Sequence, residues 1–240
     1  MAKYQSKLID RREIAENTMA FRFEKPEGFV FTPGQHVDIV LQNPPTTDEK
    51  GNGRDLSIAS ATYEPYIEIA TRMTPSAFKN TLKEIPIGSE VMLKGPGGDF
   101  MVHKEVEKPA VFLIGGIGIT PIRSIVLSAA REKWPHKLTL FYSNHTPETT
   151  PYFDDLVQAT IDNPHFRLVA VMSDMERSKE KWEGERGYIT VDLLQKQVPN
   201  FRDAIYYLSG PEQMVTAMKM LLETVSISDL QIRTEEFSGY

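Results

Sequence analysis

Three glycines lie between an apolar run and a Thr-Pro pair in residues 111–121, which read Val-Phe-Leu-Ile-Gly-Gly-Ile-Gly-Ile-Thr-Pro. The run Ala110–Ile114 predicts a buried strand of a parallel sheet. Thr120 is a good N-cap and Pro121 suits the first helical position, so we expect a helix to begin there. The free N–H groups of such a helix can bind phosphate. The residues expected at this phosphate site are Gly115, Gly116, Gly118 and Thr120. The alternative is a tight turn in which glycine only permits a positive φ.

A second group of residues, Arg54-Asp55-Leu56-Ser57, combines a guanidinium and a hydroxyl at the start of a predicted strand. Alternation along the strand places Arg54 and Leu56 on one face, and Asp55 and Ser57 on the other. An arginine can hold a phosphate through two hydrogen bonds, and a serine can donate one to a ring system. The alternative is a surface arginine beside a structural serine at the edge of a barrel.

The segment Thr74-Pro75-Ser76 predicts a second helix N-terminus. It follows a predicted strand that would lie near Arg54 in a small barrel, and its free N–H groups could bind another anion. Two anion sites this close together suit a pyrophosphate rather than a single phosphate. The alternative is an ordinary N-cap at Thr74 or Ser76.

The composition argues against several classes of function. The 240 residues carry a net charge of −6, which disfavours a general nucleic-acid binder. No apolar run approaches the length needed to cross a bilayer, and no signal-peptide core is present, so we expect a cytoplasmic protein. The absence of cysteine excludes a disulfide, a thiol nucleophile and a Cys-ligated iron–sulfur cluster within these residues. The five histidines are far apart in sequence, so we expect no metal site.

Short strands separated by turns fill the first hundred residues and predict an antiparallel barrel or sandwich. These strands are expected at 4–14, 19–24, 35–41, 56–59, 66–73 and 90–94, with a helix at 76–84 and a polar loop at 44–53. After Gly95-Pro96-Gly97-Gly98 the strands alternate with helices, which predicts a parallel sheet covered on both faces. Here we expect strands at 110–114, 137–143, 166–172, 204–208 and 230–233, and helices at 121–134, 151–161, 190–197 and 211–225.

We therefore predict two domains: an antiparallel β-barrel at 1–104, and an α/β domain with a doubly wound parallel sheet at 105–240. The charged segment 103–108 would connect them. The carboxyl ends of parallel strands face one crevice, so three turns of the second domain should line a single cleft. These turns are 115–121, 143–147 and 207–211. Three such turns suit a dinucleotide laid across the sheet.

The order and spacing of these motifs resemble the ferredoxin–NADP reductase superfamily of flavoproteins over nearly the whole chain. Arg54-Asp55-Leu56-Ser57 matches the family's Arg-x-aromatic-Ser, and Ser76 matches the serine of its pyrophosphate-binding helix. Gly95-Pro96-Gly97-Gly98-Asp99-Phe100 matches the motif that closes the barrel. The glycine turn 115–121 matches the nicotinamide-nucleotide motif, and Leu208-Ser209-Gly210-Pro211 matches a later Cys/Ser-Gly-Pro.

The resemblance implies an FAD-binding barrel followed by a domain that binds NADH or NADPH. In such proteins a hydride passes from the nicotinamide to the flavin, and electrons then pass to an acceptor. The expected acceptor is a protein such as ferredoxin, flavodoxin or an oxygenase component, or a small molecule. We therefore expect an NAD(P)H-dependent flavoprotein reductase. The alternative is a non-catalytic flavin-binding electron-relay or regulatory subunit of a larger redox complex.

The resemblance also gives roles to individual residues. Ser57 and Glu235 are expected next to the reacting flavin atoms, and Phe237, or else Tyr240, is expected to cover the ring. The residues expected to bind FAD or the nicotinamide nucleotide are Arg54, Asp55, Leu56, Ser57, Ala70, Thr71, Arg72, Thr74, Ser76, Gly115, Gly116, Gly118, Thr120, Ser143, Asn144, Ser209, Gly210, Pro211 and Phe237.

Three positions depart from the family pattern. Leu56 replaces the usual Tyr or Phe, so an aromatic wall of the flavin is either missing or supplied from elsewhere. Ser209 replaces a frequent Cys, so no thiol can assist near the nicotinamide. Asn144-His145 stands where relatives often have an arginine for the 2′-phosphate, which favours NADH because histidine is mostly neutral at pH 7. NADPH stays open because three basic residues follow: Arg177, Lys179 and Lys181.

Overall fold

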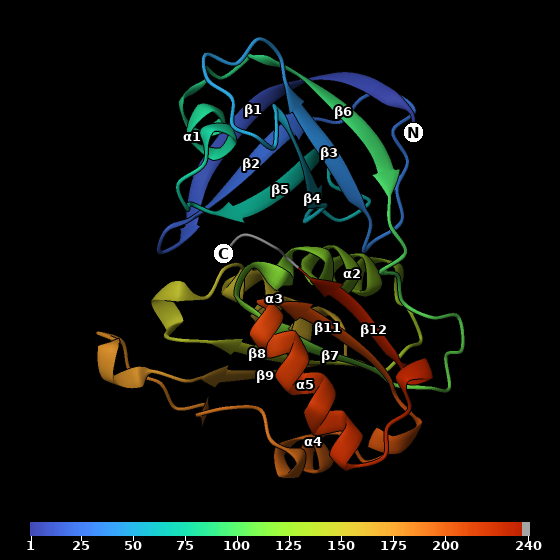
Figure 1. The fold of residues 1–240 in the computed structure, drawn as a ribbon. Coiled ribbons are helices and arrows are strands. Elements are labelled where there is room, and N and C mark those ends of the chain that lie inside the picture. Colours follow the sequence, from blue (N-terminus) through green and yellow to red (C-terminus); the bar gives the residue numbers. More distant parts are fainter. Residues whose placement is uncertain (237–240) are drawn as a thin grey trace.

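A computed structural model describes residues 1–236, and the N-terminal part of the chain forms an antiparallel sheet of six strands (Figure 1). The strand order is β4-β3-β6-β1-β2-β5. The strands are β1 (Lys3–Ala15), β2 (Thr18–Glu24), β3 (His36–Leu41), β4 (Gly53–Ser57), β5 (Tyr66–Arg72) and β6 (Glu90–Gly97). All six were predicted, because alternating apolar residues and the glycine and proline turns between them mark each strand.

The sheet curls into a barrel because its two end strands, β4 and β5, meet. Just beyond β4 the N–H of Ala59 donates to the carbonyl of Glu68 on β5 at 2.7 Å, and this bond closes the barrel. Helix α1 (Ala77–Glu84) packs on the barrel core through the buried Phe78 and Leu82. The strand residues of this core include Leu8, Phe21, Phe23, Val37, Ile39, Ile67, Ile69, Val91 and Leu93.

The second sheet has six parallel strands in the order β10-β9-β8-β7-β11-β12. The strands are β7 (Ala110–Gly115), β8 (Leu138–Asn144), β9 (Phe166–Met172), β10 (Glu185–Arg186), β11 (Ile205–Gly210) and β12 (Ile232–Glu236). The chain adds strands outward from β7 to β10 and then returns to the other side of β7 with β11. This reversal beside β7 is the switch point at which doubly wound sheets bind their ligands.

Helices cover both faces of this sheet: α2 (Ile119–Glu132), α3 (Phe153–Asp162), α4 (Val191–Gln197) and α5 (Glu212–Thr224). The side chains of β7 alternate between the two layers. Phe112 and Ile114 pack in the cluster that contains α2 and α3, whereas Val111 and Leu113 pack with α4 and α5. Because both faces are covered, the strand is an uninterrupted apolar run. In Figure 1, α2 lies on the side of the sheet next to the barrel.

An apolar interface joins the two domains. Ala20, Ala70 and Phe100 of the barrel domain belong to the same buried cluster as residues of α2. Arg123 of α2 crosses this interface, because its Nη1 donates to the Glu64 carboxylate at 2.9 Å. The domains are therefore held by packing and by a buried ion pair, since only 5% of the Arg123 side chain is exposed.

A buried carboxylate forms a second polar link between the domains. Glu68 of β5 is fully buried and accepts hydrogen bonds from Arg12 and Arg22 within the barrel, at 2.8 and 2.6 Å. Tyr152, which precedes α3, donates its hydroxyl to the same carboxylate at 2.8 Å. The Glu68 carboxylate therefore accepts hydrogen bonds from both domains, as a buried charge requires.

The predicted fold class, a barrel followed by a doubly wound parallel-sheet domain, is confirmed. Strand β9 has the predicted bounds, whereas β10 was not predicted because two residues are too short for a pattern. The domain boundary at 104/105 stays a prediction and falls between the end of β6 and the start of β7. Among residues 1–236, no helix has both the length and the apolar character that a bilayer span requires.

Candidate functional site

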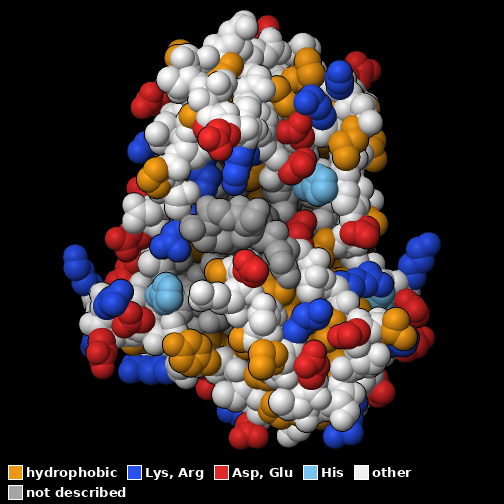
Figure 2. Space-filling view, in the orientation of Figure 1, with side chains coloured by type: hydrophobic (Ala, Val, Ile, Leu, Met, Phe, Trp, Pro, Cys, Tyr) orange, Lys and Arg blue, Asp and Glu red, His pale blue; other side chains and the backbone are white. Residues whose placement is uncertain are grey.

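A cavity of about 640 Å³ opens along the barrel beside β4, β5 and the start of α1. Its wall includes nine of the residues predicted to bind a cofactor: Arg54, Asp55, Leu56, Ser57, Ala70, Thr71, Arg72, Thr74 and Ser76. They come together because β4 and β5 are the strands that meet where the barrel closes. Lys50 and Lys79 add two further positive charges, and Figure 2 shows Lys and Arg side chains gathered on this face of the barrel domain.

The guanidinium of Arg54 is held by the loop that precedes it. Its Nη2 donates to both carboxylate oxygens of Asp48, at 2.6 and 2.8 Å. Its Nη1 donates to three carbonyl oxygens of the same loop, those of Lys50, Gly51 and Gly53. The hydrogen bond from Arg54 is the main cause that lowers the pKa of Asp48, so this carboxylate stays charged. The predicted phosphate ligand is therefore already paired with an anion of the chain itself.

The N-terminus of α1 faces the same anion. Of the two possible N-caps, Thr74 and Ser76, the structure has Ser76, whose hydroxyl accepts a hydrogen bond from the Lys79 N–H at 3.5 Å. The Ser76 hydroxyl also donates to Asp48 at 3.4 Å, and a backbone hydrogen bond from Ala77 further lowers the pKa of Asp48. The two anion sites predicted from the sequence thus converge on one carboxylate.

Ser57 and Glu235, the two predicted catalytic residues, are in contact. The Ser57 hydroxyl donates to the Glu235 carboxylate at 3.3 Å, although 178 positions separate them in the sequence. Ser57 is the buried last residue of β4, and Glu235 lies in β12 of the other domain. Burial raises the pKa of Glu235 to about 7, and the charge of Asp99 adds to this rise. The pair can therefore bind or release a proton near neutral pH.

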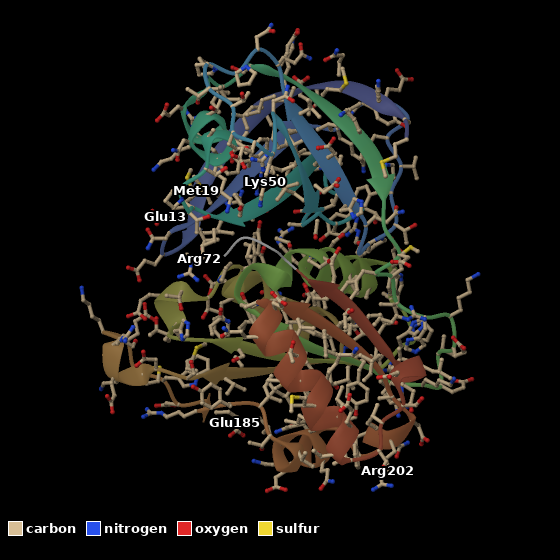
Figure 3. The ribbon with its side chains drawn as sticks, in the orientation of Figure 1. Glu13, Met19, Lys50, Arg72, Glu185 and Arg202 are labelled. Carbon is tan, nitrogen blue, oxygen red and sulfur yellow. The ribbon has the colours of Figure 1, made fainter. Side chains whose placement is uncertain are left out.

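A second cavity, of about 450 Å³, lies at the carboxyl ends of β7, β8 and β11. Arg72 and Ile117 line both cavities, so the two cavities adjoin at the boundary between the domains. Figure 3 shows Arg72 at the edge of the barrel that faces the parallel sheet. The predicted residues in the wall of the second cavity are Arg72, Gly115, Gly116, Ser143, Asn144 and Pro211.

The glycine turn differs from its prediction in where the helix begins. Helix α2 starts at Ile119, after a 3-10 turn over Gly116–Gly118, so Gly118 and not Thr120 is the N-cap. Thr120 is buried inside the helix, and its hydroxyl donates to the carbonyl of Ile117 at 3.1 Å. The helix starts early because the 3-10 turn already sets helical backbone angles, with φ −56° and ψ −8° at Gly118.

Five predicted site residues that the structure describes are not among the residues that line either cavity: Gly118, Thr120, Ser209, Gly210 and Glu235. Gly118 lets the turn after β7 approach β11, because a Cβ at this position would lie 2.6 Å from the backbone of Ser209. The roles of these residues, and of the predicted residues that do line the cavities, stay predictions. Phe237 and Tyr240, the predicted ring covers, lie outside the described residues.

A buried polar atom of Asn144 supports a ligand in the second cavity. The Asn144 Nδ2 is buried without a hydrogen-bond partner in the described structure, and Asn144 lines the cavity. Unpaired buried donors are rare in folded proteins, so they call for a partner. A nucleotide carries hydroxyl, phosphate and amide groups that can supply one.

The first cavity fits a flavin dinucleotide by its chemistry. The convergence of Arg54 and the α1 N-terminus on one carboxylate shows that this wall binds an anion with several donors. Elsewhere the wall is apolar, through Leu56, Ala70 and Ile117. A polar end for phosphates and an apolar stretch for rings match the two parts of FAD.

Several residues of the first cavity were missed from the sequence. Phe78 is the aromatic residue of its described wall and lies beneath Arg54, with the guanidinium 5.2 Å from the ring centroid. Asp48 and Lys50 were included only within a polar loop. The sequence carries no signal that distinguishes them, because Asp48-Glu49-Lys50 has the composition of an ordinary charged surface loop. Among residues 1–236, no group of His, Asp or Glu could hold a metal ion.

A barrel with an anion-binding cavity, followed by a doubly wound sheet with a glycine turn, is typical of proteins that bind a flavin and a nicotinamide nucleotide. Two family models match the chain: the oxidoreductase FAD-binding domain over residues 5–102 and the oxidoreductase NAD-binding domain over residues 112–220. The chain thus belongs to the oxidoreductases that have an FAD-binding domain followed by an NAD-binding domain, in agreement with the resemblance found in the sequence.

Similar curated proteins are reductase components. The chain is 29% identical over 225 residues to the glycine betaine monooxygenase reductase subunit of Chromohalobacter salexigens, covering 92% of this chain and 60% of that one. It is 28% identical over 220 residues to the propane 2-monooxygenase reductase component of Rhodococcus jostii, covering 90% and 58%. The chain therefore spans less than two thirds of the length of these relatives.

A solved structure of similar fold is a ferredoxin NADP+ reductase from Neisseria gonorrhoeae with bound FAD and NADP. It is 19% identical with a TM-score of 0.78, and the match covers 98% of both chains. The Amycolatopsis cytochrome P450 reductase GcoB is 23% identical with a TM-score of 0.81, covering 98% of this chain and 70% of that one. At these identities the likeness concerns the fold.

Proposed function

We propose that the chain is an FAD-containing reductase that takes a hydride from NADH and passes electrons to a separate acceptor. The observation that carries this proposal is that the two cavities adjoin at Arg72 and Ile117. A flavin in the first cavity and a nicotinamide nucleotide in the second would then meet at the domain boundary. Direct hydride transfer requires such contact, because the reacting atoms must approach to about 3–3.5 Å.

The chain's own residues would bind the cofactors and orient them. When bound, the flavin supplies the redox chemistry. Arg54 and the N-terminus of α1 would hold its pyrophosphate. Ser57 would donate its single hydrogen to the ring when Glu235 is protonated, because the carboxyl group can then donate a hydrogen bond to the Ser57 oxygen instead of accepting one from it. The pKa of about 7 suits Glu235 to both protonation states at neutral pH.

The second cavity favours NADH over NADPH. Among its described lining residues, Arg72 is the only Arg or Lys, and it stands on the barrel side. At the ends of β8 and β9 the wall contains His145, whose Nδ1 is hydrogen-bonded to the Ser173 hydroxyl at 3.2 Å. Arg177 is paired instead with Asp174 at 3.0 Å. A 2′-phosphate needs a cation, whereas ribose hydroxyls need only hydrogen-bonding partners, so this wall suits the unphosphorylated cofactor.

The proposed acceptor is an iron–sulfur protein or an oxygenase component. The relatives named above are reductase components of monooxygenases, and another is the toluate 1,2-dioxygenase electron transfer component of Pseudomonas putida. The 240 residues contain no cysteine, so a Cys-ligated cluster would lie outside them. Flavodoxin and small molecules are further acceptors to be assayed. The second candidate function is a flavin-binding relay subunit without reductase activity of its own.

One experiment tests the reductase proposal. The purified protein is heated to release its cofactor, the flavin is identified by chromatography, and the intact protein is then mixed with NADH or NADPH without oxygen. We expect FAD, and faster loss of flavin absorbance with NADH. A protein that takes up neither FAD nor FMN contradicts the proposal, and FMN alone contradicts the pyrophosphate site. Retained flavin that NADH and NADPH leave oxidised favours the relay subunit. Acceptor proteins are then compared by NADH oxidation.

A further inference from the structure

Asp48 occupies the one place in the first cavity where the donors for an anion converge. Both of its carboxylate oxygens accept hydrogen bonds from Arg54 Nη2, at 2.6 and 2.8 Å. The Ser76 hydroxyl donates to it at 3.4 Å, and the backbone of Ala77 at the start of α1 contributes a further hydrogen bond. A carboxylate in a guanidinium fork has the shape and charge of two phosphate oxygens.

The loop that carries Asp48 is built to present this carboxylate. Asp48 lies between β3 and β4, which are paired at their ends through Val40 and Gly53. The Gly51 N–H donates to the Asp48 carbonyl at 2.8 Å, and the Lys50 N–H donates to its side chain at 3.0 Å, so the loop closes on itself. A short turn on a paired hairpin keeps the carboxylate at a high effective concentration next to Arg54.

The same loop also accepts hydrogen bonds from the other terminal nitrogen of Arg54. Its Nη1 donates to the carbonyl oxygens of Lys50, Gly51 and Gly53 at 3.1, 3.0 and 2.7 Å. Only 19% of the Arg54 side chain and 31% of the Asp48 side chain are exposed. The N–H donors of this guanidinium are therefore already occupied by hydrogen bonds when a phosphate approaches.

We propose that Asp48 is an internal competitor for the pyrophosphate of FAD and must leave the Arg54 site before the cofactor can bind. This inference rests on the proposed function, because it assumes that the first cavity receives FAD. The competition acts on the protein without cofactor: only the fraction of molecules in which Asp48 has swung out can accept the pyrophosphate. If that fraction is about one in ten, the apparent affinity for FAD falls about tenfold.

The proposal predicts which rate constant changes. Removing the charge of Asp48 should raise the open fraction and therefore speed FAD association, about tenfold. Dissociation should change less than about twofold, because Asp48 has already left Arg54 in the bound state. If Asp48 merely repelled bound FAD through its charge, the variant would mainly slow dissociation. The two rate constants therefore distinguish competition from repulsion.

The experiment uses the full chain freed of flavin, with FAD as the probe. Association is followed by stopped-flow quenching of tryptophan fluorescence, and dissociation by loss of flavin after dilution, for wild type, Asp48→Asn and Asp48→Ala. The Ala variant is included because an Asn side chain can still accept one hydrogen bond from Arg54. The matched control is Glu49→Gln, which removes a neighbouring charge in the wall of the same cavity.

A double-mutant cycle adds the decisive comparison. In an Arg54→Ala background, loss of Asp48 should no longer speed FAD association, because the pair that closes the site is already gone. The proposal is overturned if Asp48→Ala associates with FAD at the wild-type rate, if Glu49→Gln speeds association equally, or if the Asp48 effect persists without Arg54. Wild-type protein that fails to bind FAD would instead overturn the proposed function.

Discussion

Ser57 is the residue whose replacement tests the proposed chemistry most directly, because its hydroxyl lines the first cavity and touches Glu235. We expect Ser57→Ala to slow flavin reduction by NADH about tenfold or more, since a hydrogen bond to the reacting ring is lost. FAD binding should change little, because Arg54 and the α1 N-terminus hold the other end of the cofactor. Stopped-flow absorbance gives the reduction rate, and equilibrium dialysis gives the affinity for FAD.

The control for this prediction is Ser60→Ala. Ser60 is also fully buried and lies three positions further on, but its hydroxyl accepts the Glu68 N–H within the barrel. Its loss should lower stability and leave the rate of flavin reduction unchanged. An equal loss of rate in both variants would mean that Ser57 acts only through the fold.

Glu235 gives a prediction for pH. Burial raises its pKa to about 7, and the carboxylate form holds the single hydrogen of Ser57 at 3.3 Å, whereas the protonated form can donate to Ser57 and leave that hydrogen for the ring. The rate of flavin reduction should therefore fall as pH rises through about 7, because the carboxylate that forms takes the Ser57 hydrogen away from the ring. In Glu235→Gln this inflection should be absent. A wild-type profile that is flat between pH 6 and pH 8 would contradict this role for Glu235.

The same raised pKa has a consequence for stability. The folded protein binds this proton more tightly than the unfolded chain, whose glutamate has a pKa near 4.5. The stabilisation from the protonated form is therefore present at low pH and lost as pH rises from about 4.5 to about 7. Thermal unfolding should show wild type losing stability relative to Glu235→Gln across that range. A constant difference in melting temperature would argue against the raised pKa.

At the scale of elements, the contact between the turn after β7 and strand β11 is the most sensitive feature. A Cβ on Gly118 would lie 2.6 Å from the backbone of Ser209, so Gly118→Ala must displace β11. We expect a loss of about 1–3 kcal/mol in the free energy of unfolding. Binding of NADH should weaken, while FAD binding in the barrel is preserved. Thermal denaturation and separate titrations with FAD and NADH measure the three quantities.

Gly116→Ala provides the comparison for this element. Gly116 has a positive φ of 52°, but a Cβ there would meet no atom within 4 Å. Its substitution should cost only the backbone strain of about 1 kcal/mol. If the two variants behaved alike, the close approach of Gly118 to β11 would not be what shapes the second cavity.

Most elements could be predicted from local pattern alone. The bounds of β9 were predicted without error, because apolar residues continue along a fully covered strand and stop at its turns. The start of α2 could not be placed in this way. Thr120 and Pro121 look like a cap and a first helical residue, but a preceding 3-10 turn had already begun the helical path. Contact with β11 stabilises that turn. This contact joins residues far apart in the sequence, so a local pattern cannot show it.

At the scale of the whole molecule, the pairing of Tyr152 with Glu68 joins the two domains. Tyr152→Phe removes only the hydroxyl that donates to this buried carboxylate, and the free energy of unfolding should fall by about 1.5–3 kcal/mol. Chemical denaturation measures the change. The control is Tyr63→Phe, because the Tyr63 side chain is half exposed and its hydroxyl should contribute within about 0.5 kcal/mol. A loss in Tyr63→Phe as large as in Tyr152→Phe would contradict the link.

Pairings between distant residues were the part that the sequence could not show. Its motifs indicated which strands and turns would line the cavities, since those roles depend on residue type and spacing. The partners of Arg54 and Tyr152 depend on how a loop folds back and how two domains dock. The carboxylates they meet, Asp48 and Glu68, carry no local signal that distinguishes them from the other acidic residues of the chain.

The contact between Ser57 and Glu235 also has a consequence for how the protein acquires its shape. It joins residues 178 positions apart, whereas the barrel's own pairings are complete by β6. Contacts of such long range form slowly, because more chain entropy must be lost to close them. During synthesis or refolding, the strands of the barrel can thus pair well before β12 brings Glu235 next to Ser57. The contact between Ser57 and Glu235 is therefore expected to form late in folding.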